Sequence, residues 1–263
     1  MAADIDVMVP AADYNAENFL PEDLLANWIR PLIAEFIGPF ALTFIGAGAI
    51  MVAFMQGYAP SDGGVLVAVA LAHGLAIGLM IAGAGHISGG HFNPAVTVGM
   101  WLGGRIGTLK AIGYIVVQLA GAVVAALFLR YIFPAAVRDG TDFGVPTLAA
   151  AGANKYLIVG RAHGLVIEAI LTFFLMFVIT GSAVDKRGFG AIAPLAIGLT
   201  ITMDIFMGGP LTGAAMNPSR EFGVALVHGE WSNWWVYWIG PIVGACVASI
   251  VHNYVFIPKS SYD

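Results

Sequence analysis

The chain has 263 residues, of which 59% are hydrophobic and 10% are charged, and its formal net charge at pH 7 is −5. Its mean hydropathy is +0.85. Because a soluble domain carries about 25% charged residues, this composition excludes a water-soluble enzyme and predicts a protein that lies in a bilayer.

The N-terminal segment is the acidic part of the chain. Residues 1–29 contain six Asp or Glu and no Lys or Arg. We therefore predict an acidic tail over residues 1–27, without the positive start of a secretory signal. The rest of the sequence has no basic cluster of the kind that would indicate nucleic acid as a partner.

Six apolar runs follow the tail, and each is close to the ~20 residues that a membrane helix needs. They cover about residues 28–55, 65–83, 108–132, 164–184, 189–207 and 234–256. None shows the alternation of a barrel strand, so we predict an all-α membrane protein with six transmembrane helices. An even number of spans places both termini on one side of the membrane.

The distribution of Lys and Arg favours a cytoplasmic location for both termini. The side of the termini would carry Arg30, Arg105, Lys110, Lys186, Arg187 and Lys259, and the opposite side Arg130, Arg138, Lys155, Arg161 and Arg220. The bias is small, but the short loop at residues 185–187 is basic and the first loop of the opposite side has no Lys or Arg, as the positive-inside rule requires. We expect the cell membrane as host membrane.

Two of the connecting segments contain an Asn-Pro pair. These are Asn93-Pro94-Ala95 and Asn217-Pro218-Ser219, and each precedes an apolar stretch too short to cross a bilayer. Asn is a good helix N-cap and Pro is favoured in the first helical turn. We predict two re-entrant half-helices whose positive N-terminal ends meet at the bilayer centre, with the amide N–H donors of the two Asn free to face a cavity.

The two Asn-Pro segments belong to a longer internal repeat. Asn93 and Asn217 are 124 residues apart, and Glu35 and Glu168, each followed by the same pattern of apolar residues, are 133 apart. We predict one domain over residues 28–257, with repeats at about 28–132 and 160–257 and a C-terminal tail at 258–263. Because each repeat has three spans, the repeats are inverted, an arrangement that places transport sites at the repeat interface.

With these motifs the chain resembles the aquaporin, or major intrinsic protein, family across residues 28–257. The resemblance implies six helices with two re-entrant half-helices, one pore in each subunit and a homotetramer. It also implies that Glu35 and Glu168 accept hydrogen bonds from the re-entrant loops and that His91 lines the inner pore. No cofactor and no catalytic activity are implied.

The resemblance also places the narrowest ring of the pore at His73, Ile205, Ala214 and Arg220. Arg220 would repel cations and donate hydrogen bonds to neutral solutes, while Ile205 and Ala214 would form an open, apolar side. The His and Ile pair is similar to that of plant tonoplast aquaporins. We therefore expect a passive water channel that also conducts ammonia, hydrogen peroxide or urea and excludes protons and ions.

Three alternatives stay open from the sequence. A glycerol facilitator of the same family is favoured by the acidic Glu221, whereas Ala225 and the Tyr237-Trp238 pair follow the water-channel pattern. A proton-coupled secondary transporter would also use inverted repeats and broken helices. A junction protein with a closed pore would give no flux.

The remaining polar residues give weaker signals. His86, His91 and His163 lack the three or four clustered ligands that a metal site needs, so we predict no metal. Cys246 lies in an apolar run and has no partner for a disulfide within the chain. Asp204, next to Ile205, could cap a loop or lie near the pore mouth, and the sequence does not choose.

Overall fold

The computed structural model describes residues 21–59, 62–149 and 159–256, and within these ranges it contains helices and no strand. The predictions for the tail up to residue 20, for Lys155 and for the C-terminal tail concern residues outside these ranges. Six long helices dominate the structure: α2 (Arg30–Met55), α3 (Gly63–Ser88), α5 (Thr108–Ile132), α7 (Arg161–Ile179), α8 (Ala193–Thr212) and α10 (Val236–Val251).

Short turns extend several of these helices. They are α1 (Pro21–Leu24) and η2 (Leu25–Ile29) before α2, η4 (Thr180–Val184) after α7, η5 (Gly190–Ile192) before α8 and η6 (His252–Phe256) after α10. With them, six helical segments of 21 to 31 residues are long and apolar enough to cross a membrane. Large apolar side chains are exposed along their outer faces, as expected for surfaces that contact lipid.

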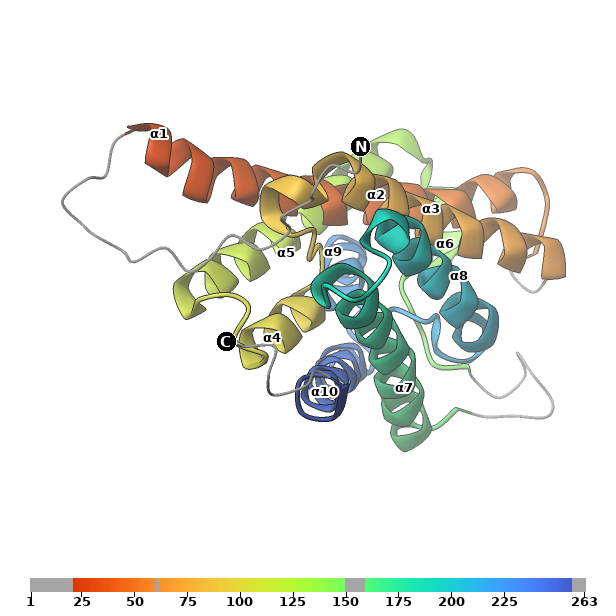
Figure 1. Ribbon diagram of the computed structural model, residues 1–263. Coiled ribbons are helices and arrows are strands. Elements are labelled where there is room, and N and C mark those ends of the chain that lie inside the picture. The colour runs from red at the N-terminus through yellow and green to blue at the C-terminus, as the bar shows by residue number, and fades with distance from the viewer. Residues whose placement is uncertain (1–20, 60–61, 150–158, 257–263) are drawn as a thin grey trace.

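Two further helices are half as long. α4 (Pro94–Leu102) has 9 residues and α9 (Pro218–His228) has 11. At a rise of about 1.5 Å per residue they extend about 14 and 17 Å, half of a hydrocarbon core of about 30 Å. The structure therefore confirms the all-α fold with six spanning helices and two half-helices (Figure 1).

Two of the predicted spans end too early. The runs at 65–83 and 189–207 continue as helix to Ser88 and Thr212. In each case a left-handed glycine ends the helix, Gly89 at φ 89° and Gly213 at φ 83°, because glycine adopts this conformation without steric cost.

The two repeats pack in the same way. α2 contacts α3 and α5 in the first repeat, and α7 contacts α8 and α10 in the second. The repeats meet through α3 and α8, and each half-helix packs on the last helix of the other repeat, α4 on α10 and α9 on α5 (Figure 1). The half-helices are thus enclosed by both repeats.

The α3–α8 contact depends on small residues. A Cβ atom at Gly74 or Gly198 would strike the backbone of the opposite helix, and one at Gly78 would meet the Pro194 carbonyl. Close approach of this kind is typical of helix pairs in lipid. The structure thus places Gly74 and Gly78 in a helix contact within the monomer.

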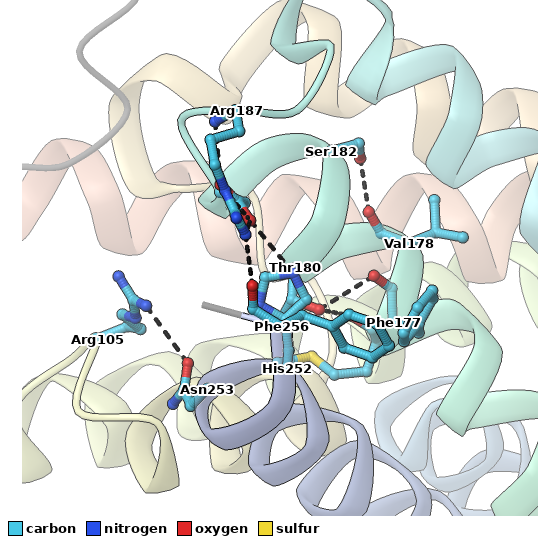
Figure 2. A network of polar contacts seen from close by, with 11 residues as sticks. Arg105, Phe177, Val178, Thr180, Ser182, Arg187, His252, Asn253 and Phe256 are labelled. Atoms are coloured by element: carbon cyan, nitrogen blue, oxygen red, sulfur yellow. Dashed lines mark hydrogen bonds and ion pairs between the residues drawn. The ribbon is translucent and has the colours of Figure 1, made fainter. Parts of the chain in front are cut away.

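One end of the molecule, which we call the inner end, collects the loops before α5 and α8 together with the end of η6. Figure 2 shows Arg187 beside the Phe256 carbonyl and Arg105 beside Asn253. The Arg187 Nη2 atom donates to the Phe256 oxygen at 2.6 Å, and the Arg105 Nη2 atom donates to the Asn253 oxygen at 3.3 Å. At the opposite, outer end lie Arg130 and Arg161, which contact Val227 and Asn233.

Candidate functional site

The two half-helices begin at the centre of the molecule, and Asn93 and Asn217 cap them. The Asn93 Oδ1 atom accepts from the Ala95 N–H at 2.8 Å, and the Asn217 Oδ1 atom accepts from the Ser219 N–H at 3.0 Å. These are the caps that the Asn-Pro pairs predict. Pro94 and Pro218 occupy the first helical turn, where no N–H is needed.

The amide N–H groups of the two Asn are only partly free. The Asn93 Nδ2 atom donates to the Met216 carbonyl at 2.8 Å, and the Asn217 Nδ2 atom donates to the Phe92 carbonyl at 2.9 Å. Each NH2 group has two N–H donors, so one donor of each Asn binds the opposite repeat and one remains for the cavity. The expectation that the amide N–H donors of both Asn are free is therefore wrong for one donor of each Asn.

Ser219 takes part in the second cap. Its hydroxyl donates to the Asn217 Oδ1 atom at 2.7 Å, and its side chain is fully buried. Ala95, at the same place in the first repeat, has no such group. The orientation of the Asn217 amide is therefore fixed by one hydrogen bond more than that of Asn93.

Glu35 lies beneath the first re-entrant loop and accepts four hydrogen bonds. Its Oε1 atom accepts from the Ser88 hydroxyl at 2.7 Å and the His91 N–H at 2.9 Å. Its Oε2 atom accepts from the Phe92 N–H and the Gln118 Nε2 atom, both at 2.7 Å. The carboxylate thus satisfies loop N–H groups that have no water to bind at this depth.

Glu168 has the same position beneath the second loop and accepts three hydrogen bonds. Its Oε1 atom accepts from the Thr212 hydroxyl at 2.7 Å and the Ala215 N–H at 3.0 Å. Its Oε2 atom accepts from the Met216 N–H at 2.8 Å. The two carboxylates therefore contact the loops in the way that the resemblance implied.

Two tyrosines support these loops, and their role was not predicted from the sequence. The Tyr114 hydroxyl donates to the Ser88 carbonyl at 2.8 Å, and the Tyr237 hydroxyl donates to the Thr212 carbonyl at 2.9 Å. The two tyrosines are 123 residues apart, close to the spacing of the Asn pair. A search for polar residues at the repeat spacing would have found them.

Three residues of the predicted constriction, His73, Ile205 and Ala214, line one cavity, and the fourth, Arg220, contacts His73; all four are buried. His73 is on α3, Ile205 is on α8, Ala214 is in the second re-entrant loop, and Arg220 is in the first turns of α9. Their exposed fractions are 3% to 5%. Ala214 has a left-handed backbone with φ 45°, a conformation that is uncommon for residues other than glycine.

Two contacts orient Arg220. Its Nη1 atom donates to the Gly144 carbonyl at 2.7 Å, and its Nη2 atom lies 3.4 Å from the His73 Nε2 atom. The His73 Nδ1 atom lies 2.8 Å from the Val69 carbonyl. Because a carbonyl only accepts, Nδ1 carries the proton in that bond, which leaves Nε2 as an acceptor for Arg220.

Space for the His73 ring comes from α2. A Cβ atom at Gly46 would overlap the imidazole of His73. Any larger residue at this position would push the ring toward Arg220 or out of the constriction. Gly46 therefore belongs to the candidate site, although it carries no functional group.

A narrow cavity of about 30 Å³ runs along the repeat interface. Since one water needs about 10–15 Å³ on this measure, the cavity has room for about two water molecules. Its lining includes His73, Ile205, Ala214, both cap Asn residues and His91. Most other lining residues are aliphatic, with Leu42, Ile77, Leu175, Ile179 and Ile201 among them.

His91 lies on the inner side of the cap Asn residues. Its Nδ1 atom is 3.2 Å from the Thr97 hydroxyl, and its ring meets the Tyr114 ring edge to face at 5.3 Å. The Thr97 hydroxyl in turn contacts the Asn93 carbonyl and the Gln118 amide. The structure thus places His91 at the cavity with its ring orientation fixed by two neighbours.

Asp204 and Glu221 are two further buried carboxylates. Asp204 is 2% exposed on α8, and its Oδ2 atom has no hydrogen-bond partner among the described residues. Glu221 is buried beside Arg220, but its Oε2 atom accepts from the Trp238 Nε1 atom at 3.2 Å. Within the described ranges Glu221 forms no ion pair with Arg220.

The inner end carries one further cluster, formed by Asp185, Arg187 and His252. Arg187 donates to both carboxylate oxygens of Asp185, and these hydrogen bonds lower the pKa of Asp185 to about 2. The His252 Nε2 atom lies 3.9 Å from Asp185, beneath the loop (Figure 2). Within the described ranges no group of three metal-ligating side chains is present.

Six spanning helices, two half-helices that meet at a polar centre and a narrow cavity between inverted repeats define an integral membrane channel. The sequence matches the family "Major intrinsic protein" over residues 25–252. The chain therefore belongs to the major intrinsic protein family, the family of aquaporins, and it is a channel rather than an enzyme.

Relatives that are named as aquaporins agree with this family assignment. The chain is 43% identical to "Probable aquaporin TIP3-2" of Arabidopsis thaliana, over 88% of this chain and 85% of the relative. It is 39% identical to "Aquaporin TIP4-4" of Zea mays, over 90% and 91% of the two chains. The aquaporin resemblance and its TIP-like character are thus confirmed.

A solved structure shows the same fold. The X-ray structure of the aquaglyceroporin from Plasmodium falciparum superposes with a TM-score of 0.73 at 26% sequence identity. The match covers 89% of this chain and 99% of that one. The fold is therefore shared with a protein that is named an aquaglyceroporin.

Proposed function

We propose that this aquaporin-family channel conducts water passively, together with small neutral solutes such as ammonia, hydrogen peroxide or urea, and excludes protons and other ions. The proposal rests on the four buried side chains that we assign to a constriction at the outer half of the cavity. Arg220 and His73 supply polar groups on one side, and Ile205 and Ala214 supply a small apolar side.

Water would pass by exchanging hydrogen bonds with the fixed polar groups. One N–H donor of Asn93 and one of Asn217 remain free at the centre of the cavity, and His91 offers a further polar atom on the inner side. The N-terminal ends of α4 and α9 both lie at this centre. Their partial positive charges and the Arg220 guanidinium repel cations, including hydronium.

The wider solute range follows from Ile205. An aliphatic side chain at this position leaves more space beside Arg220 than an aromatic ring would. A neutral solute that can accept a hydrogen bond from Arg220 replaces the lost water contacts, whereas an ammonium ion is repelled. Ammonia is therefore expected to pass and ammonium to be excluded.

We also propose the assembly and orientation that go with this function. The single channel domain covers residues 28–257, with repeats at about 28–132 and 160–257. Exposed aliphatic side chains on α3 and α8 suit contacts within a homotetramer in lipid. The inner end carries Arg105, Lys186 and Arg187, so the positive-inside rule places it and both termini in the cytoplasm, with the cell membrane as host.

Flux through proteoliposomes tests the proposal. Stopped-flow light scattering would measure water and urea permeability, and a pH-sensitive dye would follow ammonia. Wild type should pass water and at least one of the two solutes, and collapse of the proton gradient should not change the rates. Arg220→Ala should raise urea permeability and retain water flux, while Lys186→Ala, which removes an exposed cation outside the pore, should behave as wild type.

The same measurements separate the alternatives. Water flux without ammonia or urea flux would overturn the wider solute range, and an unchanged solute profile in Arg220→Ala would overturn the assignment of the constriction. Glycerol flux that exceeds urea flux would favour a facilitator of the glycerol type. Accumulation against a solute gradient would indicate a coupled transporter, and absence of any flux a closed junction protein.

A further inference from the structure

The loop that holds Arg220 has an unusual backbone. Asp142, Phe143 and Gly144 are consecutive residues with positive φ angles of 47°, 54° and 68°. Glycine adopts this region freely and Asp tolerates it, but it costs free energy for a residue such as Phe. Something must therefore stabilise Phe143 in this conformation, which aims the Gly144 carbonyl at the Arg220 Nη1 atom, 2.7 Å away.

The stabilising contacts of Phe143 are visible in the structure. Its side chain is 1% exposed and packs in a cluster with Ala47, Met51 and Val224. Its ring also stacks on the ring of His228, with centroids 5.6 Å apart and planes 17° from parallel. His228 is the last residue of α9, the half-helix that carries Arg220 near its start.

The loop and the half-helix are therefore joined at two points. Near the start of α9, the Arg220 guanidinium binds the Gly144 carbonyl, and at its end the His228 ring stacks on Phe143. Two adjacent loop residues thus contact one short helix at positions eight residues apart, which fixes where the carbonyl lies relative to the helix. Among the residues that the structure describes, His73 provides the second polar contact to the guanidinium, at 3.4 Å.

We propose that Phe143 and His228 are positioning residues of the channel: their stacked rings hold the Gly144 carbonyl in place, and this carbonyl sets how far the Arg220 guanidinium extends into the pore. The proposal rests on the proposed role of Arg220 in solute selection. Neither ring touches the solute. When the stack is lost, the carbonyl moves, Arg220 becomes mobile and larger neutral solutes pass more easily.

The variant His228→Ala tests the proposal with little risk to folding, because His228 is only half buried. We expect the ratio of urea to water permeability to rise about threefold, the factor that corresponds to the free energy of an aromatic stack. His228→Phe keeps a ring in the stack and should restore the wild-type ratio. Leu226→Ala, on the same helix with a side chain that is 46% exposed, is the matched control and should leave the ratio unchanged.

A double variant shows whether the effect acts through Arg220. In the Arg220→Ala background, His228→Ala should add nothing to the solute ratio, since coupled residues are not additive. An unchanged ratio in His228→Ala, or an equal rise in both backgrounds, would overturn the proposal while leaving the constriction assignment intact. If Arg220→Ala itself leaves the ratio unchanged, the constriction assignment fails, and this proposal fails with it.

Discussion

The two repeats of this channel have nearly the same backbone and different chemistry. Gly89 and Gly213, Gly90 and Ala214, and Phe92 and Met216 are pairs at a spacing of 124 residues, and all six have positive φ angles. The capping Asn, the bracing Glu and the supporting Tyr also occur in both halves.

The pore-lining residues do not follow this symmetry. At the same spacing, the constriction residues His73, Ile205, Ala214 and Arg220 correspond to Ile197, Ile81, Gly90 and Val96, which line the inner half of the cavity. The inner four are all apolar or glycine. The duplicated scaffold therefore builds two equivalent rings. His73 and Arg220 make the outer ring polar, whereas their counterparts in the inner ring are apolar.

Loss of either bracing carboxylate should have the largest effect. Glu35→Gln and Glu168→Gln each place an NH2 group against N–H donors of the loop, and each buried donor left unpaired costs about 1–3 kcal/mol. Glu35 accepts four hydrogen bonds and Glu168 three, so Glu35→Gln should be the less stable variant. Thermal unfolding in detergent, followed by tryptophan fluorescence, measures the difference, with Glu230→Gln as the control outside the loops. Equal stability of all three variants would contradict the bracing role.

Replacement of Arg220 by its counterpart should remove the larger of the two differences between the rings, with His73 as the remaining one. Arg220→Val removes the cation and its donors, and we expect the ratio of urea to water permeability to rise about tenfold, the factor that one charge-assisted hydrogen bond represents. Val96→Ala in the inner ring should change this ratio by less than about twofold, because it removes only an apolar contact. Stopped-flow measurements of urea and water permeability in both variants test this expectation. A larger change in Val96→Ala would show that selection takes place at the inner ring.

Gln118 is the clearest difference between the bracing networks. It donates to Glu35, whereas Pro241 is at the corresponding place in the second repeat. Gln118→Leu removes the hydrogen bonds to Glu35 and Thr97. It should lower the free energy of unfolding by about 2 kcal/mol, at a net value of about 1 kcal/mol for each hydrogen bond, and leave permeability unchanged. A destabilisation larger than that of Glu35→Gln would mean that Gln118 supports more than these two contacts.

The inner loops of the two repeats should differ in their response to acid. Asp185 has a pKa of about 2, below its ordinary value of 3.8, because Arg187 donates to it. Its contacts therefore stabilise the protein fully above about pH 4 and are lost as the pH falls toward 2. The difference in melting temperature between wild type and Asp185→Asn should shrink over this range. Asn253→Ala removes the hydrogen bond that Arg105 donates to an amide oxygen, a group that does not titrate. Its effect on the melting temperature should not depend on pH over the same range.

Much of the fold was predictable from the sequence because its signals are local. The apolar runs set the six spans, and each Asn-Pro pair set the start of a half-helix to the residue. The repeat paired Glu35 with Glu168, and their contacts to the loops were expected from the resemblance to the aquaporin family. The helix ends at Ser88 and Thr212 were missed, since a left-handed glycine is recognised only from the backbone.

The contacts of the site were less predictable because they involve backbone atoms far along the chain. The carbonyls of Met216, Phe92 and Gly144 carry no side-chain signal, yet they accept from Asn93, Asn217 and Arg220. The partner of Glu221 was likewise hidden, because Trp238 lies 17 residues away on another helix. Sequence reasoning thus identified the polar groups but not the atoms that orient them.

The crossed hydrogen bonds between the cap Asn residues and the opposite loops have a consequence for how the protein forms. When the first three spans have been synthesised and inserted, the Asn93 amide has no Met216 carbonyl to bind, and the Phe92 carbonyl has no Asn217. The first re-entrant segment therefore completes its hydrogen bonds only after the second one has entered the membrane from the other side. We therefore expect the centre of the channel to become ordered only when both halves are in the membrane.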